Sequence, residues 1–246
     1  MKVELVLDAQ ANVGEGPLWH APSQRFYWVD INHNEVHIYT PGDGADRTID
    51  VGQKVGTVVV RAKGGLLLAL HHGLGFLDID SEKITMLCDP EADLTDNRFN
   101  DGKCDPAGRF WAGTMSLSRN PGTANLWRLD PDLSVHRMLE GVTVSNGLVW
   151  SLDHRTMYYI DTSTLKVDAF DYELETGAIA NRRAVVSFPE DTGKPDGMAI
   201  DVRGMLWIAH FGGSCVSCWD PATGTLLQTI EVPTDNVTAC AFGGPN

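Results

Sequence analysis

The sequence predicts an all-β fold, specifically a six-bladed β-propeller, from three observations. An oxygen-bearing side chain followed by glycine recurs along the chain, and the aligned glycines lie 40, 46, 45 and 50 residues apart: Gly16, Gly56, Gly102, Gly147 and Gly197. Each unit holds short aromatic and β-branched stretches separated by turns rich in Gly, Asp, Asn and Pro. No stretch of ten or more residues keeps a helical apolar spacing without a Gly or Pro. Such a period is typical of propeller blades rather than of a sandwich.

The strands within each unit follow the same order. An apolar run after the glycine is expected to be the first strand, and an aromatic or β-branched stretch the second. The second strands are expected at residues 25–30, 109–113 and 157–161, and the third at 35–39, 124–129, 167–172 and 215–219. The turns between strands are expected at residues 63–65, 105–108, 153–155 and 202–204. Each unit therefore predicts one small antiparallel sheet.

The last blade is expected to be incomplete. A sixth first strand is predicted at residues 236–242, and the sequence stops at Asn246 before a hairpin could follow. Residues 1–10 alternate apolar and polar side chains, so we expect them to supply an outer strand of that blade. The expectation is one propeller domain over residues 1–246 that lacks the C-terminal strands of its last blade.

Composition narrows the kinds of partner. The formal net charge of -14 leaves no basic patch, which argues against nucleic acid and anionic membranes as partners. Residues 1–10 lack a basic start and a long apolar core, so we expect no leader peptide, and no apolar run is long enough to span a membrane. The five cysteines indicate buried free thiols rather than a disulfide framework. We therefore expect a cytoplasmic monomer or weak oligomer that acts on a small molecule.

Three of the repeated polar residues predict a metal site. In a propeller, the first strand of each blade lines the central channel, so equivalent positions face one another. Glu15, Asn146 and Asp196 would bring two carboxylates and an amide oxygen to one point, a donor set that suits Ca²⁺, Mg²⁺ or Mn²⁺. The alternative is that Asn-Gly and Asp-Gly are simply tight turns. Glu15 favours the site, because Glu has no preference for such turns.

Two further residues are candidates for binding substrate. Arg98 and Asn100 precede the third glycine of the repeat, and a guanidinium with an amide suits the hydroxyl and carbonyl oxygens of a polyol. The alternative is a structural Arg98 that pairs with Asp96 or Asp101.

Other spacings predict no site. His33 and His37 would lie about 13 Å apart on a strand, too far for shared ligation. Cys215 and Cys218 would face opposite sides of a strand, and His210 is a weaker candidate for the pocket lining.

The chain resembles the family of gluconolactonase, regucalcin (senescence marker protein) and luciferin-regenerating enzymes. The resemblance rests on Glu15-Gly16-Pro17-Leu18-Trp19, Arg98-Phe99-Asn100-Asp101-Gly102-Lys103, Ala112-Gly113-Thr114-Met115, Val144-Ser145-Asn146-Gly147-Leu148 and Pro195-Asp196-Gly197-Met198. It implies a six-bladed propeller with one divalent cation (Ca²⁺, Zn²⁺, Mn²⁺ or Mg²⁺) in the channel. By position it makes Glu15, Asn146 and Asp196 the metal ligands, with Arg98 and Asn100 holding substrate.

The resemblance also implies an activity, and the sequence differs from the family pattern at one substrate-binding position. Lactonase members of the family hydrolyse sugar lactones, so we expect a metal-dependent hydrolase that converts aldonolactones to aldonic acids. The metal would polarise the lactone carbonyl, and Asp196 would activate water as the catalytic base. Ser118 stands where the family places a substrate-binding carboxylate, which predicts an altered substrate preference. Alternatives are a calcium-binding regulatory protein and a metal-dependent organophosphate or phosphotriester hydrolase.

Overall fold

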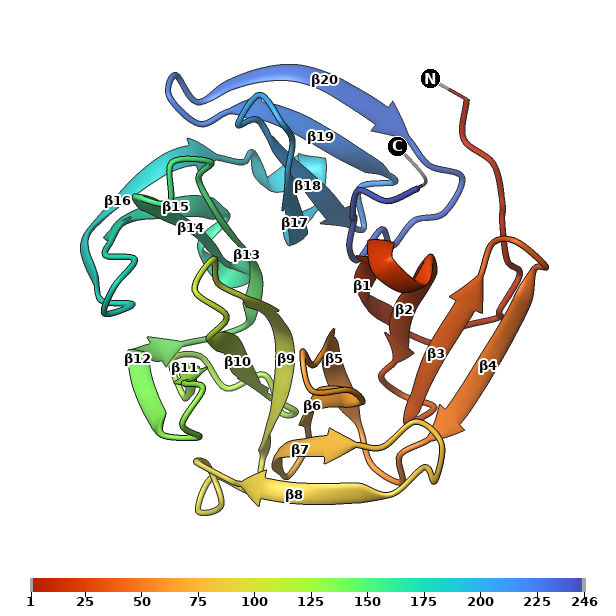
Figure 1. Ribbon diagram of the computed structural model, residues 1–246. Coiled ribbons are helices and arrows are strands. Elements are labelled where there is room, and N and C mark those ends of the chain that lie inside the picture. The colour runs from red at the N-terminus through yellow and green to blue at the C-terminus, as the bar shows by residue number, and fades with distance from the viewer. Residues whose placement is uncertain (1, 245–246) are drawn as a thin grey trace. The chain divides into compact units, whose positions relative to one another are not determined.

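The computed structural model describes residues 2–244, and their regular structure is almost entirely β. The described strands form five four-stranded antiparallel sheets, and within each sheet the strands lie in chain order (Figure 1). The strands are β1 (Gly14–His20), β2 (Arg25–Asp30), β3 (Glu35–Thr40), β4 (Ala45–Asp50), β5 (Val55–Val60), β6 (Leu66–Leu70), β7 (Gly73–Leu77), β8 (Ile84–Cys88), β9 (Asn97–Cys104), β10 (Phe110–Ser116), β11 (Ala124–Leu129), β12 (Val135–Val142), β13 (Ser145–Trp150), β14 (Thr156–Asp161), β15 (Lys166–Tyr172), β16 (Ile179–Ser187), β17 (Lys194–Ile200), β18 (Leu206–Phe211), β19 (Cys215–Asp220) and β20 (Thr225–Glu231). Three short 3₁₀ segments, Ala21–Ser23, Thr162–Thr164 and Glu190–Thr192, are the helical elements of residues 2–244. The all-β propeller class is confirmed.

The prediction of six blades is wrong, because residues 2–244 contain five such sheets. The segment expected to start a sixth sheet, residues 236–242, does not form a strand. Asn236 makes an isolated bridge with Phe211, and the Thr238 carbonyl accepts a hydrogen bond from Gly197 N at 2.7 Å. These contacts are too few to form a hydrogen-bonded ladder. Of the expected outer strand, Met1 lies outside the described residues and residues 2–10 form no strand.

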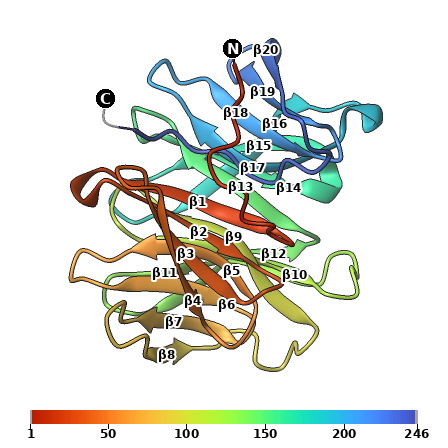
Figure 2. The same cartoon turned by 90° about the vertical axis from the view of Figure 1, so that its right-hand side faces the viewer.

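The chain divides into two compact units. The three-sheet unit (residues 13–145 and 241–246) contains β1–β4, β5–β8 and β9–β12. The two-sheet unit (residues 1–12 and 146–240) contains β17–β20 and, apart from Ser145, β13–β16. The first sheet of the three-sheet unit shows the common plan, with β1 to β4 side by side (Figure 2).

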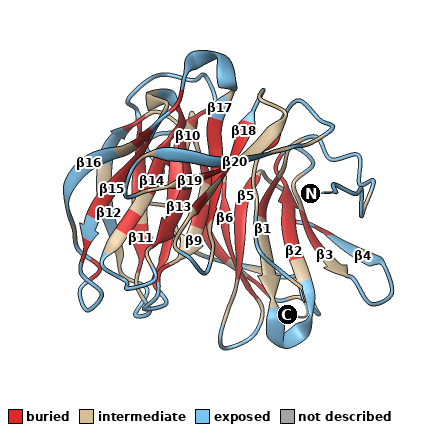
Figure 3. Ribbon diagram, turned by 90° about the horizontal axis from the view of Figure 1, so that it is seen from above, coloured by how far each residue is buried: buried red, intermediate tan, exposed pale blue. Residues whose placement is uncertain are grey.

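Burial decreases from the first strands to the fourth strands. Every residue of β13 is buried, whereas β20 is exposed at every position except the half-buried Ile230. The same contrast separates β5 from β4, which is mostly exposed (Figure 3). Apolar side chains on the buried strands, such as Val58 and Leu68, form the hydrophobic clusters between strands. The polar residues of the repeat therefore lie on strands that are better protected than the fourth strands.

The repeated polar–glycine pairs are not hairpin turns. They lie inside first strands, where the pairing with the second strand is irregular. One extra residue occurs between Glu15 and Leu18 in β1, between Pro195 and Met198 in β17, and likewise between Phe99 and Gly102 in β9. Such β-bulges bend a strand and re-aim its side chains, and they are common next to active sites.

Close packing explains two of these glycines. A Cβ on Gly56 would lie 2.3 Å from the carbonyl oxygen of Asn100, and a Cβ on Gly147 would lie 2.7 Å from that of Asp196. Both contacts join the first strands of neighbouring sheets within one unit. Glycine is needed because any side chain would push these strands apart.

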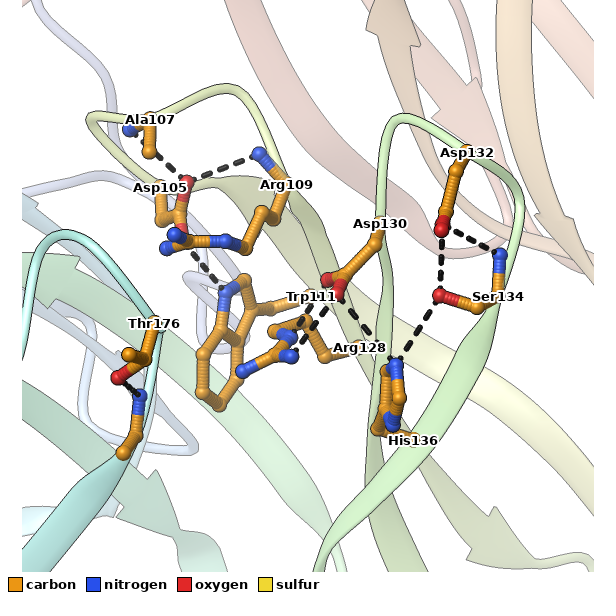
Figure 4. A network of polar contacts seen from close by, with 11 residues as sticks. Asp105, Ala107, Arg109, Trp111, Arg128, Asp130, Asp132, Ser134, His136 and Thr176 are labelled. Atoms are coloured by element: carbon orange, nitrogen blue, oxygen red, sulfur yellow. Dashed lines mark hydrogen bonds and ion pairs between the residues drawn. The ribbon is translucent and has the colours of Figure 1, made fainter.

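Asp–Trp hydrogen bonds stabilise the hairpins that follow the first strands β9 and β17. Asp105 accepts hydrogen bonds from Arg109 N at 2.9 Å and Trp111 Nε1 at 3.1 Å (Figure 4). Asp201 repeats the arrangement, with Met205 N at 3.0 Å and Trp207 Nε1 at 3.2 Å. Although burial raises the pKa of Asp201, its hydrogen bonds prevail and bring the pKa to about 2.

Candidate functional site

Two acidic side chains lie close together in the three-sheet unit. Glu15, near the start of β1, is 7% exposed and accepts a hydrogen bond from Gly16 N at 3.2 Å. Burial and the negative charge of Asp101 raise the pKa of Glu15 to about 8, against the opposing effects of the Gly16 N–H and Arg98. Burial also raises the pKa of Asp101, although Lys103 and the Gly102 N–H oppose this. Such a pair creates a strong local demand for a cation.

Arg98 and Asn100 lie beside this pair on β9 and contact each other. Arg98 Nη1 donates to Asn100 Oδ1 and to the carbonyl oxygen of Phe99, both at 2.8 Å. Asn100 Nδ2 donates to the carbonyl oxygen of Ser145 at 2.8 Å. Arg98 is half-buried and its charge lowers the pKa of Glu15, so the guanidinium lies within electrostatic reach of the carboxylate pair. These bonds hold the two predicted substrate-binding residues in a fixed orientation.

Ser118 lies in the same unit and is bound to a carboxylate. Its hydroxyl donates to Asp96 Oδ1 at 2.9 Å, and Ser116 Oγ donates to Asp96 Oδ2 at 2.5 Å. These two hydroxyl bonds lower the pKa of Asp96, which also interacts electrostatically with His71. Asp96 therefore supplies a carboxylate directly beside Ser118.

In the two-sheet unit, Asn146 and Asp196 are neighbours on adjacent first strands. Asn146 Nδ2 donates to Thr162 Oγ1 at 2.8 Å, and Thr162 Oγ1 donates to the carbonyl oxygen of Pro195 at 2.8 Å. Asn146 and Asp196 are 4% and 6% exposed, so both side chains are held in buried positions. The bond to Thr162 fixes the Asn146 amide with its Oδ1 oxygen turned away from that hydroxyl.

His210 stabilises the segment that leads into β17. Its Nε2 lies 2.6 Å from Ser217 Oγ, which also accepts from Trp219 Nε1 at 2.6 Å. Its Nδ1 lies 2.9 Å from the carbonyl oxygen of Thr192, so Nδ1 carries the proton and donates. Burial lowers the pKa of His210 and keeps the ring neutral. These contacts give His210 a structural role in placing the strand that carries Asp196.

The structure therefore groups the predicted residues by unit. Glu15, Arg98 and Asn100 lie together in one unit, and Asn146 and Asp196 lie together in the other. The sequence interpretation named Asp96 and Asp101 only as alternative partners of Arg98 and not as site residues, although Asp101 precedes a glycine of the repeat just as Glu15 does. Thr162 was also missed, because its bond to Asn146 joins positions 16 residues apart.

Comparison with known proteins identifies the family. The family described as SMP-30/Gluconolactonase/LRE-like region matches residues 13–246. The chain belongs to this family. It is 41% identical to regucalcin from Xenopus laevis over 253 residues, covering 100% of this chain and 84% of that protein. It is 39% identical to a protein of Bacillus subtilis named putative sugar lactone lactonase YvrE, covering 99% of this chain and 84% of that protein.

A solved structure of a family member has the same fold. The crystal structure of a calcium-binding protein, regucalcin, from Agrobacterium tumefaciens superposes with a TM-score of 0.91 at 25% identity. The match covers 96% of this chain and 79% of that one. Within residues 2–244 of the present chain, no helix is long and apolar enough to cross a membrane. The family match thus supports a lactonase-like hydrolase.

Two other predictions about side chains have outcomes. All five cysteines are free thiols; Cys218 is buried, and the other four are half-buried rather than buried as expected. The spacing argument that set His33 and His37 aside applies only to two residues on one strand, but β3 begins at Glu35 and His33 lies in the preceding loop.

Proposed function

We propose that this protein is a divalent-metal-dependent hydrolase that opens sugar lactones to aldonic acids. The observation that carries the proposal is the buried carboxylate of Glu15, which has the half-buried Asp101 as a like-charged neighbour and lies beside Arg98 and Asn100. A carboxylate whose pKa is about 8 in the absence of a cation is a poor structural element but a good ligand. The lactonase names within the family support the same reaction class.

We assign the cation to Glu15, Asn146 and Asp196. Each residue stands near the start of the first strand of its own sheet, directly before a glycine. Their donors are oxygens, which fits Ca²⁺, Mg²⁺ or Mn²⁺ and also allows Zn²⁺. When bound, the cation would supply Lewis-acid polarisation of the lactone carbonyl and stabilise the negative charge that develops on its oxygen.

The chain's own side chains would carry out the remaining steps. Asp196 would accept a proton from water as the water oxygen adds to the carbonyl carbon. The ring C–O bond then breaks, the leaving oxygen takes up that proton to become a hydroxyl, and the new carboxylic acid releases its own proton to water to give the carboxylate. Arg98 and Asn100 would orient the sugar hydroxyls, since their mutual hydrogen bond already fixes them. Ser118, with Asp96 behind it, would contact the far end of the substrate.

A calcium-binding regulatory role is the second candidate. The Agrobacterium regucalcin is described as a calcium-binding protein, and the same oxygen donors would serve in either case. The lactonase reading accounts for Arg98 and Asn100, which an ion-binding site alone would not need. The cytoplasmic location, the monomeric or weakly oligomeric state and the absence of nucleic-acid or membrane partners stay predictions.

One experiment separates these functions. Metal-stripped protein would be incubated with a panel of aldonolactones and a phosphotriester, each cation being restored in turn, and acid release followed with a pH indicator. We expect lactone opening that depends on a restored cation and falls at least about 10²-fold in Asp196→Ala. Asp191→Ala, at an exposed position nearby, is the matched control. Opening of no lactone with any cation would favour the calcium-binding role, and full activity in Asp196→Ala would reject its assignment as base.

A further inference from the structure

A second group of metal-ligating side chains lies in the hairpin of β2 and β3, apart from the residues assigned above. Asp30, His33 and Glu35 each offer one ligand atom, and these atoms all lie within 4.8 Å of one another. Ligand atoms around a tetrahedral zinc ion are about 3.4 Å apart, because zinc–nitrogen and zinc–oxygen distances are about 2.1 Å. The three side chains therefore need only small rotations to meet at one ion.

The backbone fixes one of these ligands and leaves the other two adaptable. Asp30 is 1% exposed, and its Oδ1 accepts hydrogen bonds from Val13 N at 3.1 Å, Asn32 N at 3.2 Å and His33 N at 3.3 Å. Its Oδ2 lies 2.8 Å from His33 Nδ1. The His33 side chain is 51% exposed and the Glu35 side chain 32% exposed. A preformed carboxylate thus faces an imidazole and a second carboxylate that can move.

A buried histidine supplies the independent observation. His37 is 6% exposed, and its Nε2 makes no hydrogen bond to the described residues although it lies 3.4 Å from Glu35 Oε2. Its Nδ1 lies 2.7 Å from Asp46 Oδ2, and the ring is stacked on Trp28 with centroids 3.8 Å apart. An imidazolium could donate to both Asp46 and Glu35, but a neutral ring that donates Nδ1–H to Asp46 points its Nε2 lone pair at a carboxylate oxygen, a repulsion that a cation between them would relieve.

This arrangement matches how proteins prepare a histidine to bind metal. A metal-bound histidine usually donates its other ring N–H to a carboxylate, which fixes the tautomer and raises the basicity of the ligating nitrogen. Asp46 would play that part for His37. The His37 Nε2 to Glu35 Oε2 distance of 3.4 Å also equals the separation expected for two zinc ligands.

We propose that Asp30, His33, Glu35 and His37 bind a zinc-like divalent cation, with Asp46 positioning His37. Two imidazoles with two carboxylates favour Zn²⁺ or a neighbouring transition metal over Ca²⁺ and Mg²⁺, which prefer oxygen donors. Asp50, which pairs with Glu35 across the sheet, adds negative charge. The positive charge of Lys54 opposes this negative charge, because Lys54 Nζ lies 2.7 Å from Oδ1 of Asn32, the residue next to His33.

The test measures zinc binding directly and does not depend on the lactonase proposal. Chelator-treated Glu15→Gln protein, in which the assigned catalytic cation site is damaged, would be titrated with Zn²⁺ by calorimetry, and bound zinc would be counted by elemental analysis. We expect about one zinc per chain. Adding His33→Ala should weaken binding at least about 10-fold, and Asp46→Asn should weaken it about 10–100-fold through His37.

Controls separate a built site from loose surface binding. His136→Ala is the matched variant, because His136 is also an exposed histidine beside a carboxylate, 3.4 Å from Asp130 (Figure 4). It should leave zinc affinity unchanged, and excess Ca²⁺ should not displace the zinc. Cobalt substituted for zinc should give the visible absorption of a tetrahedral site with nitrogen donors.

Three results would overturn the proposal. These are no zinc bound by the Glu15→Gln protein, equal affinity with and without His33→Ala, or an equal loss in His136→Ala. Because His33 is in an exposed loop, its replacement should not prevent folding, and circular dichroism would verify this. If His37→Gln folds and keeps full affinity, His37 is not the fourth ligand.

Discussion

Two glutamates of the three-sheet unit are equally buried, but one is surrounded by hydrogen-bond donors and the other lies beside a second carboxylate. Glu15 and Glu91 are each 7% exposed. Glu91 Oε1 accepts hydrogen bonds from Asn125 Nδ2 at 2.6 Å, Trp127 Nε1 at 2.8 Å and Thr114 Oγ1 at 3.0 Å, and its Oε2 accepts from Asn97 Nδ2 at 2.8 Å. Glu15 has a backbone N–H at 3.2 Å and a second carboxylate, Asp101, as its neighbour.

The difference shows that burial alone does not reveal what a carboxylate does. Glu91 lies in the loop after β8, and its donors come from β9, β10 and β11, so its charge holds one sheet together. Glu15 is not compensated in this way, and its folded state without a cation is a costly one. The negative charge of a structural carboxylate is compensated by hydrogen-bond donors of the protein. The charge of a carboxylate that binds a ligand is instead compensated by that ligand.

The largest expected effect is on activity at Glu15. Glu15→Gln keeps the size of the side chain but removes its charge, and losing several kcal/mol of metal-derived stabilisation should lower kcat/KM for a lactone about 10³-fold or more. The metal-free protein should be no less stable at pH 8, because a repulsive charge has gone. Steady-state rates and melting curves on the same preparations test both parts. A large loss of metal-free stability would place Glu15 with Glu91 as a structural residue.

The opposite result is expected at Glu91. Glu91→Ala leaves four buried donors without their acceptor, which should lower the free energy of unfolding by about 3–5 kcal/mol. Urea unfolding measures this, and kcat per folded molecule should change far less than in Glu15→Gln. Thr114→Val, which removes a single donor, is the milder control, at about 1 kcal/mol. A neutral Glu91→Ala would show that donor number does not mark structural carboxylates.

The third, intermediate effect is on the pH dependence of the stability of the metal-free protein, and it follows from the raised pKa of Glu15. Because that pKa is raised from 4.5 in the unfolded chain to about 8 in the folded one, the folded state holds a proton that the unfolded state has released between these values. Metal-free wild type should therefore lose stability relative to Glu15→Gln as the pH rises from about 4.5 to about 8, by a few kcal/mol in total. Chemical unfolding at several pH values gives the difference curve. A saturating cation should abolish it, and a flat difference curve without metal would contradict the raised pKa.

The smallest effect on the pH dependence of stability is expected from Asp101, the neighbour of Glu15. Asp101→Asn removes the charge that, after burial, helps to raise the pKa of Glu15, so the same difference curve should end at a lower pH. The curve would be measured against Asp101→Asn/Glu15→Gln. An unchanged curve would mean that burial alone, and not the pair, raises the Glu15 pKa.

The repeat predicted the strands well but misjudged what its glycines do. The spacing of Gly16, Gly102 and Gly197 located the first strands, because every sheet repeats the same local pattern. Asn-Gly and Asp-Gly are statistically turn-forming, and nothing local reveals that a Gly147 side chain would strike a neighbouring strand. That contact is between strands far apart in the sequence. The count of six blades failed for a related reason, since a strand-like sequence at residues 236–242 lacks a ladder partner.

The polar contacts of the candidate site were the least predictable part. Asp96 and Ser118 are 22 residues apart and meet only because β9 and β10 pair and the chain turns back after β10. The His33 group was missed because the spacing of His33 and His37 was judged as if both residues lay in a strand: with His33 in a loop, its distance to Asp30 depends on the turn and not on strand spacing. Sequence patterns fix the periodic elements, while irregular loops are decided by hydrogen bonds between distant residues.

The extra residue in each bulged first strand has a consequence for evolution by insertion and deletion. Side chains alternate between two faces along a strand. One added residue therefore reverses the alternation, so that the side chains after it point to the opposite face from the one they would otherwise occupy. Deleting Gly16 or Gly197 would make β1 or β17 regular and would turn one end of that strand inside out. The hairpin of β2 and β3, which pairs without any shift, has no such dependence on a single residue. The number of residues in these first strands is therefore as important for the fold as the identity of the residues they carry.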